Sequence, residues 1–199
     1  KTWTTLDDLV AQVAADAKVP AMSLTVIHRG RMQSAVTGVR ERGKPELVRK
    51  GEPWLIGSIG KPVCSTVIAR LVEQGTLRWE MTLAEALPRL PMRPEYRSLT
   101  LDQLARHRSG LPQDRTFTGL DVMRIAGMEK DPVKLRRRYA VDILGRAPAS
   151  PVGEFRYSNA GYTLLGVIAE KVTGVPYEEL VRTLVYSPLK LRGSYVTPL

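Results

Sequence analysis

Ser58 and Lys61 are the first residues whose types and spacing could support a reaction, because a hydroxyl and an amine stand three positions apart. They lie where a glycine-containing loop gives way to an apolar segment. If Ser58 lies on the first turn of a helix, positions i and i+3 share one face, so the amine can reach the hydroxyl. The positive helix N-terminus and the adjacent cation would then stabilise a developing alkoxide. The spacing indicates a nucleophilic serine, although an N-cap serine followed by a surface lysine gives the same pattern.

Tyr157 and Asn159 form a second candidate pair, far downstream and just before another helical pattern. In an extended segment a two-residue step puts both side chains on one side of the chain. A phenol beside an ammonium group has a lowered pKa and can act as general base toward a serine hydroxyl. The amide of Asn159 can orient Lys61 and hold a substrate carbonyl. The two pairs together suggest acyl transfer through a serine.

The two elements, Ser58-Ile-Gly-Lys61 and Tyr157-Ser-Asn159, resemble the motifs of the serine β-lactamase and penicillin-binding-protein superfamily. The likeness is to its Tyr-x-Asn branch, which contains class C β-lactamases, D-alanyl-D-alanine carboxypeptidases and related esterases. The segment from His107 to Pro112 is similar to the His-x-Ser-Gly-Leu stretch of that family. Three ordered motifs are more specific than one, and the resemblance runs from the hairpin expected at 21–39 to the helix expected at 176–186.

The resemblance implies a role for each site residue. Ser58 would be the acylated nucleophile, Lys61 and Tyr157 the proton-transfer pair, and Asn159 a substrate-positioning residue. The backbone N–H of Ser58 would form half of an oxyanion hole. No cofactor and no metal is implied.

The third motif of the family, a Lys-Thr-Gly or His-x-Gly tripeptide on a strand, has no counterpart in the 199 residues. We therefore expect this chain to be an N-terminal portion of a longer protein, with an incomplete sheet, and the resemblance leaves the activity of the chain alone open. His107 could serve as a triad base, but Lys61 and Tyr157 already fill that role, which favours a structural histidine.

The elements that position these residues follow from hydrophobic periodicity. Residues 4–18 have the spacing of an amphipathic helix, and residues 21–39 alternate around Arg29-Gly30 as a β-hairpin. Helical patterns are expected at 61–74, 99–107, 131–144, 159–174 and 177–186.

This order predicts an α+β fold, with an antiparallel sheet flanked by helices and a helical domain inserted into it. The resemblance makes that fold β-lactamase/transpeptidase-like. We expect residues 1–56 to form the N-terminal helix and hairpin, residues 57–160 a helix-rich domain with both motifs, and residues 161–199 helices that return to the α/β region.

The composition limits the kinds of binding partner that can be expected. No apolar run is long enough for a transmembrane segment. The formal net charge of +10 favours weak contact with anionic polymers, but the densest basic cluster, Lys134, Arg136, Arg137 and Arg138, fits a solvated helical face, so no specific nucleic acid is expected. The single cysteine, Cys64, is expected to be a buried, inert thiol. The resemblance favours a periplasmic or secreted location over a cytoplasmic one, and the oligomeric state is open.

The leading hypothesis is thus a serine hydrolase acting on an ester, a β-lactam or a D-amino-acid amide, from small molecules to peptidoglycan-like acyl donors. The alternative is a catalytically incomplete binding protein of the penicillin-recognition type. Covalent labelling of Ser58 separates the two.

Overall fold

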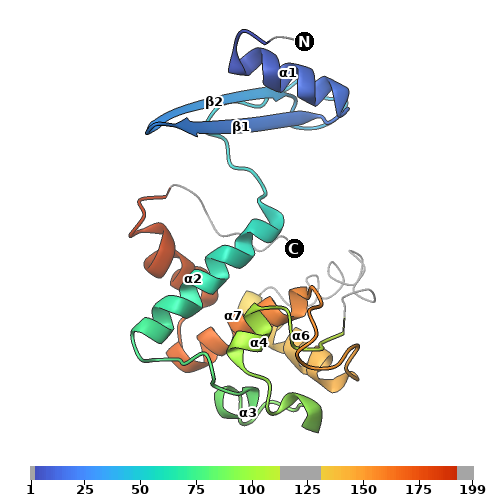
Figure 1. The fold of residues 1–199 in the computed structure, drawn as a ribbon, viewed down its shortest axis with the longest axis vertical. Helices are drawn as coiled ribbons and strands as arrows, with labels where there is room; N and C mark the ends of the chain where they lie inside the picture. Colours follow the sequence, from blue (N-terminus) through green and yellow to red (C-terminus); the bar gives the residue numbers. More distant parts are fainter. Residues whose placement is uncertain (1–2, 113–130, 192–199) are drawn as a thin grey trace. The chain divides into compact units, whose positions relative to one another are not determined.

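The computed structural model describes residues 3–112 and 131–191 (Figure 1). The chain divides into two compact units, Lys1–Leu55 and Ile56–Leu199. Each unit is described by itself. The three-part division expected from the sequence stays a prediction.

The first unit consists of a helix and a hairpin. Helix α1 (Leu6–Asp16) begins at Thr5, whose hydroxyl and the Asp8 carboxylate cap each other's backbone N–H. Strands β1 (Ala21–His28) and β2 (Arg31–Gly38) pair antiparallel in register, with His28 opposite Arg31. The two turn residues, Arg29 and Gly30, have positive φ angles of 49° and 75°, as a tight two-residue hairpin requires. The predicted helix and hairpin are confirmed.

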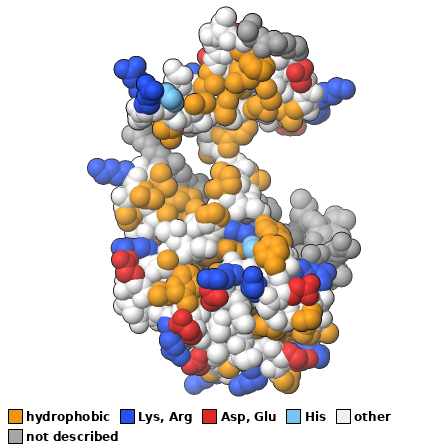
Figure 2. Space-filling view, viewed as in Figure 1, with side chains coloured by type: hydrophobic (Ala, Val, Ile, Leu, Met, Phe, Trp, Pro, Cys, Tyr) orange, Lys and Arg blue, Asp and Glu red, His pale blue; other side chains and the backbone are white. Residues whose placement is uncertain are grey.

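Much of the apolar surface of the hairpin lies open among the described residues. Ile27 and Met32, which face each other next to the turn, are 72% and 70% exposed, and hydrophobic side chains gather over this unit in Figure 2. The alternating pattern of the sequence therefore agrees with the observed burial only at the start of β1, where Met22 and Leu24 are half-buried. The described sheet has two strands and is not closed.

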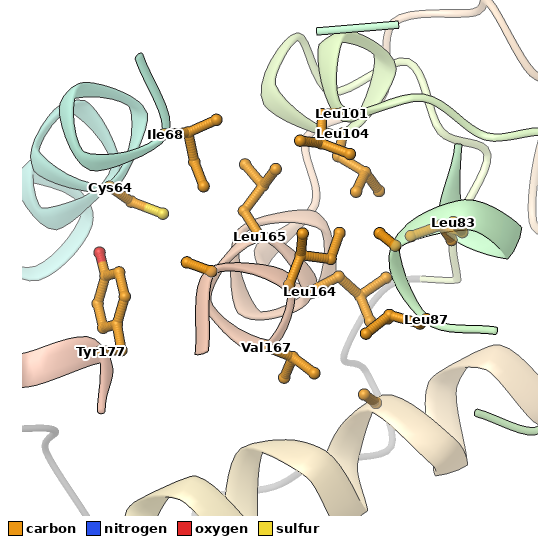
Figure 3. Packing of buried hydrophobic residues seen from close by; sticks show 14 of the residues in the cluster. Cys64, Ile68, Leu83, Leu87, Leu101, Leu104, Leu164, Leu165, Val167 and Tyr177 are labelled. Atoms are coloured by element: carbon orange, nitrogen blue, oxygen red, sulfur yellow. The ribbon is translucent and has the colours of Figure 1, made fainter. Parts of the chain in front are cut away.

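The second unit is built around one central helix, α7 (Asn159–Thr173). Its buried residues lie on all sides, so it packs against several neighbours, and Figure 3 shows Leu164 and Leu165 pointing to different ones. Helix α2 (Gly60–Glu73) packs on α7 through an apolar face that includes Cys64 and Ile68. The predicted helices at 61–74 and 159–174 are confirmed.

Further elements cover the rest of α7. Helices α3 (Leu83–Ala86) and α4 (Leu101–Ala105) each begin at a threonine that forms a capping box, and the 3-10 turn η2 (Pro94–Tyr96) lies between them. Helix α6 (Pro132–Gly145) begins with a proline after Asp131, and α8 (Tyr177–Val181) continues into the π-helical segment η4 (Arg182–Tyr186). Helix α4 is shorter than the 99–107 pattern predicts, because His107 has a left-handed φ of 58°.

The basic cluster on α6 departs from its predicted surface role at one position. Lys134, Arg137 and Arg138 are exposed, but Arg136 is 9% exposed and pairs with Glu170 of α7 and Glu178 of α8. Burial of a guanidinium group is tolerated because both carboxylates compensate its charge. In the described part of the chain, no helix is long and apolar enough to cross a membrane.

Candidate active site

Ser58 lies at the N-terminal end of α2, where the sequence predicts it. It is the middle residue of the 3-10 turn η1 (Gly57–Ile59), which continues directly into α2. Gly57 has a φ of 51°, which a residue with a side chain adopts only with strain. The Lys61 Nζ, on the first turn of α2, donates a hydrogen bond of 3.2 Å to the Ser58 Oγ. The expected contact across three positions is therefore present.

Tyr157 and Asn159 flank the residue that begins α7. Ser158 is buried, and its Oγ caps the helix by accepting a 3.3 Å hydrogen bond from the Gly161 backbone N–H. Its two neighbours consequently point the other way and are exposed. The Tyr157 hydroxyl donates to the Ser58 Oγ at 2.7 Å, and the Asn159 Oδ1 accepts from the Lys61 Nζ at 2.7 Å. All four predicted site residues thus meet in one hydrogen-bonded cluster.

Packing between α2 and α7 fixes the relative positions of the two motifs. One turn beyond Lys61, the Ser65 Oγ lies 3.2 Å from the Tyr162 hydroxyl, which also donates to the Ala105 carbonyl at 2.9 Å. The neighbouring thiol of Cys64 is buried against the same helix, and its burial raises the thiol pKa to about 11. Cys64 is therefore a packing residue in its thiol form, as predicted.

His107 contacts the segment that carries Tyr157 and Asn159. Its Nδ1 accepts a 3.0 Å hydrogen bond from the Ser158 backbone N–H, and its ring stacks on the Tyr157 ring at 4.5 Å with an angle of 30°. The Arg156 backbone N–H donates to the His107 carbonyl at 2.7 Å. These contacts are with the backbone and with the face of an aromatic ring, so they orient Tyr157.

The residues after His107 tie this support to the loop that leads to Tyr157. The Gly153 and Ala149 backbone N–H groups donate to the carbonyls of Arg108 and Gly110, both at 2.9 Å. Gly110 has a φ of 69°, and a Cβ there would overlap the Ser150 carbonyl oxygen. The glycine of the His-x-Ser-Gly-Leu stretch is thus explained by close packing of two loops.

Lys61 influences the pKa values of two neighbouring side chains. Hydrogen bonding from its ammonium group, followed by that from the Ser58 hydroxyl, lowers the pKa of the Tyr157 phenol. Burial, and then the charge of Lys61, lowers the pKa of His107. The low pKa agrees with the contact above, since an Nδ1 that accepts a hydrogen bond carries no proton. Near neutral pH, His107 is therefore uncharged and stacks on Tyr157, whose phenol has a lowered pKa.

Tyr162 also lies next to the cluster, although it is not among the residues predicted to form the site. The Lys61 Nζ lies 5.7 Å from the centre of the Tyr162 ring and 4.7 Å from that of Tyr157. Two aromatic faces therefore favour a cation at this position. The signal in the sequence is the helical i, i+3 spacing between Asn159 and Tyr162, which places both on the side of α7 that faces α2.

The fold and the cluster agree with the class that the sequence resembles, the serine β-lactamases and penicillin-binding proteins. The family model described as Beta-lactamase matches residues 6–199, and the chain belongs to that family.

Three similar proteins illustrate the relationship. Penicillin-binding protein 4 of Amycolatopsis lactamdurans is 29% identical over 182 residues, which cover 90% of this chain and 45% of the relative. A solved octameric penicillin-binding protein homologue from Pyrococcus abyssi has a TM-score of 0.74 and 30% identity, covering 97% of this chain and 44% of that one. A class C β-lactamase from Rhodobacter sphaeroides has a TM-score of 0.69 and 26% identity, covering 93% and 48%.

These likenesses confirm the predicted β-lactamase-like fold class. The chain spans less than half the length of the curated relatives it matches.

Proposed function

We propose that this protein is a serine hydrolase that works through an acyl-enzyme on Ser58. The observation that carries the proposal is the position of the Ser58 Oγ, which lies 3.2 Å from the Lys61 Nζ and 2.7 Å from the Tyr157 hydroxyl. A serine hydroxyl is a weak nucleophile unless a nearby base removes its proton. Two groups that can share that proton are within hydrogen-bonding distance.

In the first step the Ser58 Oγ attacks the acyl carbon and loses its proton to the Lys61/Tyr157 pair. The lowered pKa of Tyr157 favours its phenolate form, which accepts a proton from Ser58. The adjacent ammonium stabilises the phenolate. The same pair then protonates the leaving group, and water attacks the acyl-enzyme to release the acid.

Asn159 and the backbone of Ser58 position the substrate in this proposal. The Asn159 Oδ1 holds the Lys61 ammonium, which leaves its amide NH₂ to donate to a substrate carbonyl or amide. The Ser58 backbone N–H, at the start of a helical segment, supplies one donor for the oxyanion.

For the substrate we propose an ester, a β-lactam or a D-amino-acid amide. The names of the relatives, a penicillin-binding protein and a class C β-lactamase, favour the β-lactam and related peptide amides. We also propose a periplasmic or secreted location, where such acyl donors occur.

Hydrolysis assays test the proposal. We expect the 199-residue chain to cleave at least one of p-nitrophenyl butyrate, nitrocefin and D-phenylalanine p-nitroanilide. Ser58→Ala should abolish the activity and Lys61→Ala should lower it severely, whereas Ser187→Ala, an exposed serine elsewhere, should leave it unchanged. Reversible binding of a β-lactam without turnover or acylation would favour the alternative, a non-catalytic binding protein.

A further inference from the structure

A cavity of about 430 Å³ lies between α6, α7 and the turn that follows α3. It lies toward the C-terminal end of α7. Lys171, on its wall, is twelve residues beyond Asn159, which is about 18 Å along the helix axis. The cavity is therefore separate from the Ser58 cluster. Its volume falls within the range of roughly 300–1,000 Å³ that is usual for small-molecule sites.

The floor of the cavity is apolar. Leu87, Leu90 and Val167 line it and are at most 9% exposed, and Val133 of α6 adds a half-buried side chain. Figure 3 shows Leu87 and Val167 on the part of the core that faces α6. A ligand would thus find a preformed hydrophobic surface, which binds hydrocarbon by removing it from water.

The rim of the cavity is cationic. Arg89, Arg137 and Lys171 line it from three different elements, and all three are exposed. Some exposed arginines are held in ion pairs, as Arg70, Arg78 and Arg182 are, but within residues 3–112 and 131–191 the three rim cations form no ion pair. Three positive charges around an apolar floor raise the local concentration of anions.

The acidic residue on the cavity wall does not neutralise this rim. The Glu170 Oε1 accepts hydrogen bonds from the Arg136 guanidinium group and, at 3.0 Å, from the Tyr177 backbone N–H. Glu170 is 8% exposed, and its carboxylate is already held by these partners.

A helix-stabilising role accounts for Lys171 alone, because a cation in the last turn interacts favourably with the helix dipole. It does not account for Arg89, in a turn, or for Arg137, in the middle of α6.

From this combination we propose that the cavity binds an amphiphilic carboxylate: a small molecule with an apolar chain that lies on the floor and one carboxylate that the rim cations hold. The proposal is independent of the chemistry at Ser58. The two sites share α7 but no residue.

Isothermal titration of the whole chain with octanoate tests the proposal. We expect one octanoate per chain, with binding weakened by salt, because the exposed charge pairs are screened. Octan-1-ol, which lacks the charge, and inorganic phosphate, which lacks the chain, should each bind at least about tenfold more weakly.

Variants locate the site. The triple variant Arg89→Ala, Arg137→Ala, Lys171→Ala should weaken octanoate binding about thirtyfold, at about threefold for each exposed cation. Arg138→Ala, the matched control one position along α6, and Ser58→Ala should bind octanoate as the unaltered protein does. Because the three side chains are exposed and form no ion pair with another described residue, the variant should keep its circular dichroism spectrum. The single Arg137→Glu variant offers a second test with the same expected direction.

The proposal is overturned if octanoate shows no saturable binding, if the triple or Arg137→Glu variant binds it equally well, or if the alcohol or phosphate binds as tightly. Loss of octanoate binding in Ser58→Ala would assign the ligand to the candidate active site and would also overturn it.

Discussion

Replacement of His107 tests whether this residue holds the second motif in place. The Ser158 backbone N–H is buried and donates to the His107 Nδ1 at 3.0 Å, so His107→Ala leaves a buried donor without its acceptor. Such a group costs about 1–3 kcal/mol. Loss of the stacked contact with Tyr157 adds about 0.5–1.5 kcal/mol. We therefore expect His107→Ala to lower the free energy of unfolding by about 3 kcal/mol.

His107→Asn is the matched control. An asparagine side chain has an acceptor oxygen near the position of Nδ1, and asparagine tolerates the left-handed φ of 58° better than alanine does. Only the ring stacking is lost, so the expected cost is about 1 kcal/mol. Urea denaturation followed by circular dichroism at pH 8 measures both values. An equal loss in the two variants would refute the role assigned to the hydrogen bond.

The same contact predicts a pH dependence. The pKa of His107 is lowered by burial and then by the charge of Lys61, so the folded state binds fewer protons at this site than the unfolded chain does. Stability that is fully present above the ordinary value of 6.5 is then lost as the pH falls through the lowered pKa of the folded state. Urea midpoints between pH 8 and pH 5 should fall more steeply for the unaltered protein than for His107→Asn. Parallel curves would show that another group carries the effect.

Three further predictions concern other residues. Tyr157→Phe should slow acylation about 10²–10⁴-fold. In the unaltered protein the acylation rate should rise with pH and level off below the ordinary tyrosine pKa of 10.0, because the pKa of this phenol is lowered, and Tyr157→Phe should remove that rise. Stopped-flow measurement with an activated ester between pH 6 and pH 10 gives both results, and an unchanged rate would exclude Tyr157 from proton transfer. Arg136→Met should lower the free energy of unfolding by about 3–5 kcal/mol, because it leaves Glu170 buried without its cation. Arg137→Met, on the exposed face of the same helix, should change the free energy of unfolding by less than about 0.5 kcal/mol. Similar urea midpoints for the two variants would contradict the buried ion pair. Cys64 should react with a thiol reagent at pH 8 only after unfolding, because burial raises its pKa to about 11; rapid labelling of the folded chain would show that the packing around it is open.

The local part of the site could be predicted from the sequence. The three-position spacing of Ser58 and Lys61 implies their contact once a helix begins there, and the two-residue step from Tyr157 to Asn159 implies a shared side. Their meeting across two helices could be expected from the resemblance, since no local pattern pairs residues so far apart. The three hydrogen bonds that join the four residues are present in the structure.

Other interactions between distant elements could not be predicted. Arg136 looks like its exposed neighbours in the sequence, because its partners Glu170 and Glu178 belong to helices far along the chain. The stacking of His107 on Tyr157 likewise depends on a left-handed backbone at position 107, which no residue type requires there. The cavity lined by Arg89, Arg137 and Lys171 arises only when three elements pack together.

Mass spectrometry of the trapped adduct shows directly whether Ser58 forms an acyl-enzyme. The chain, of 22.1 kDa, is mixed with benzylpenicillin or p-nitrophenyl butyrate, quenched in acid and mapped by peptide fragmentation. We expect one acyl group per chain, placed on Ser58 and absent from Ser58→Ala. An adduct on any other residue, or one that persists in Ser58→Ala, would show that Ser58 is not the nucleophile.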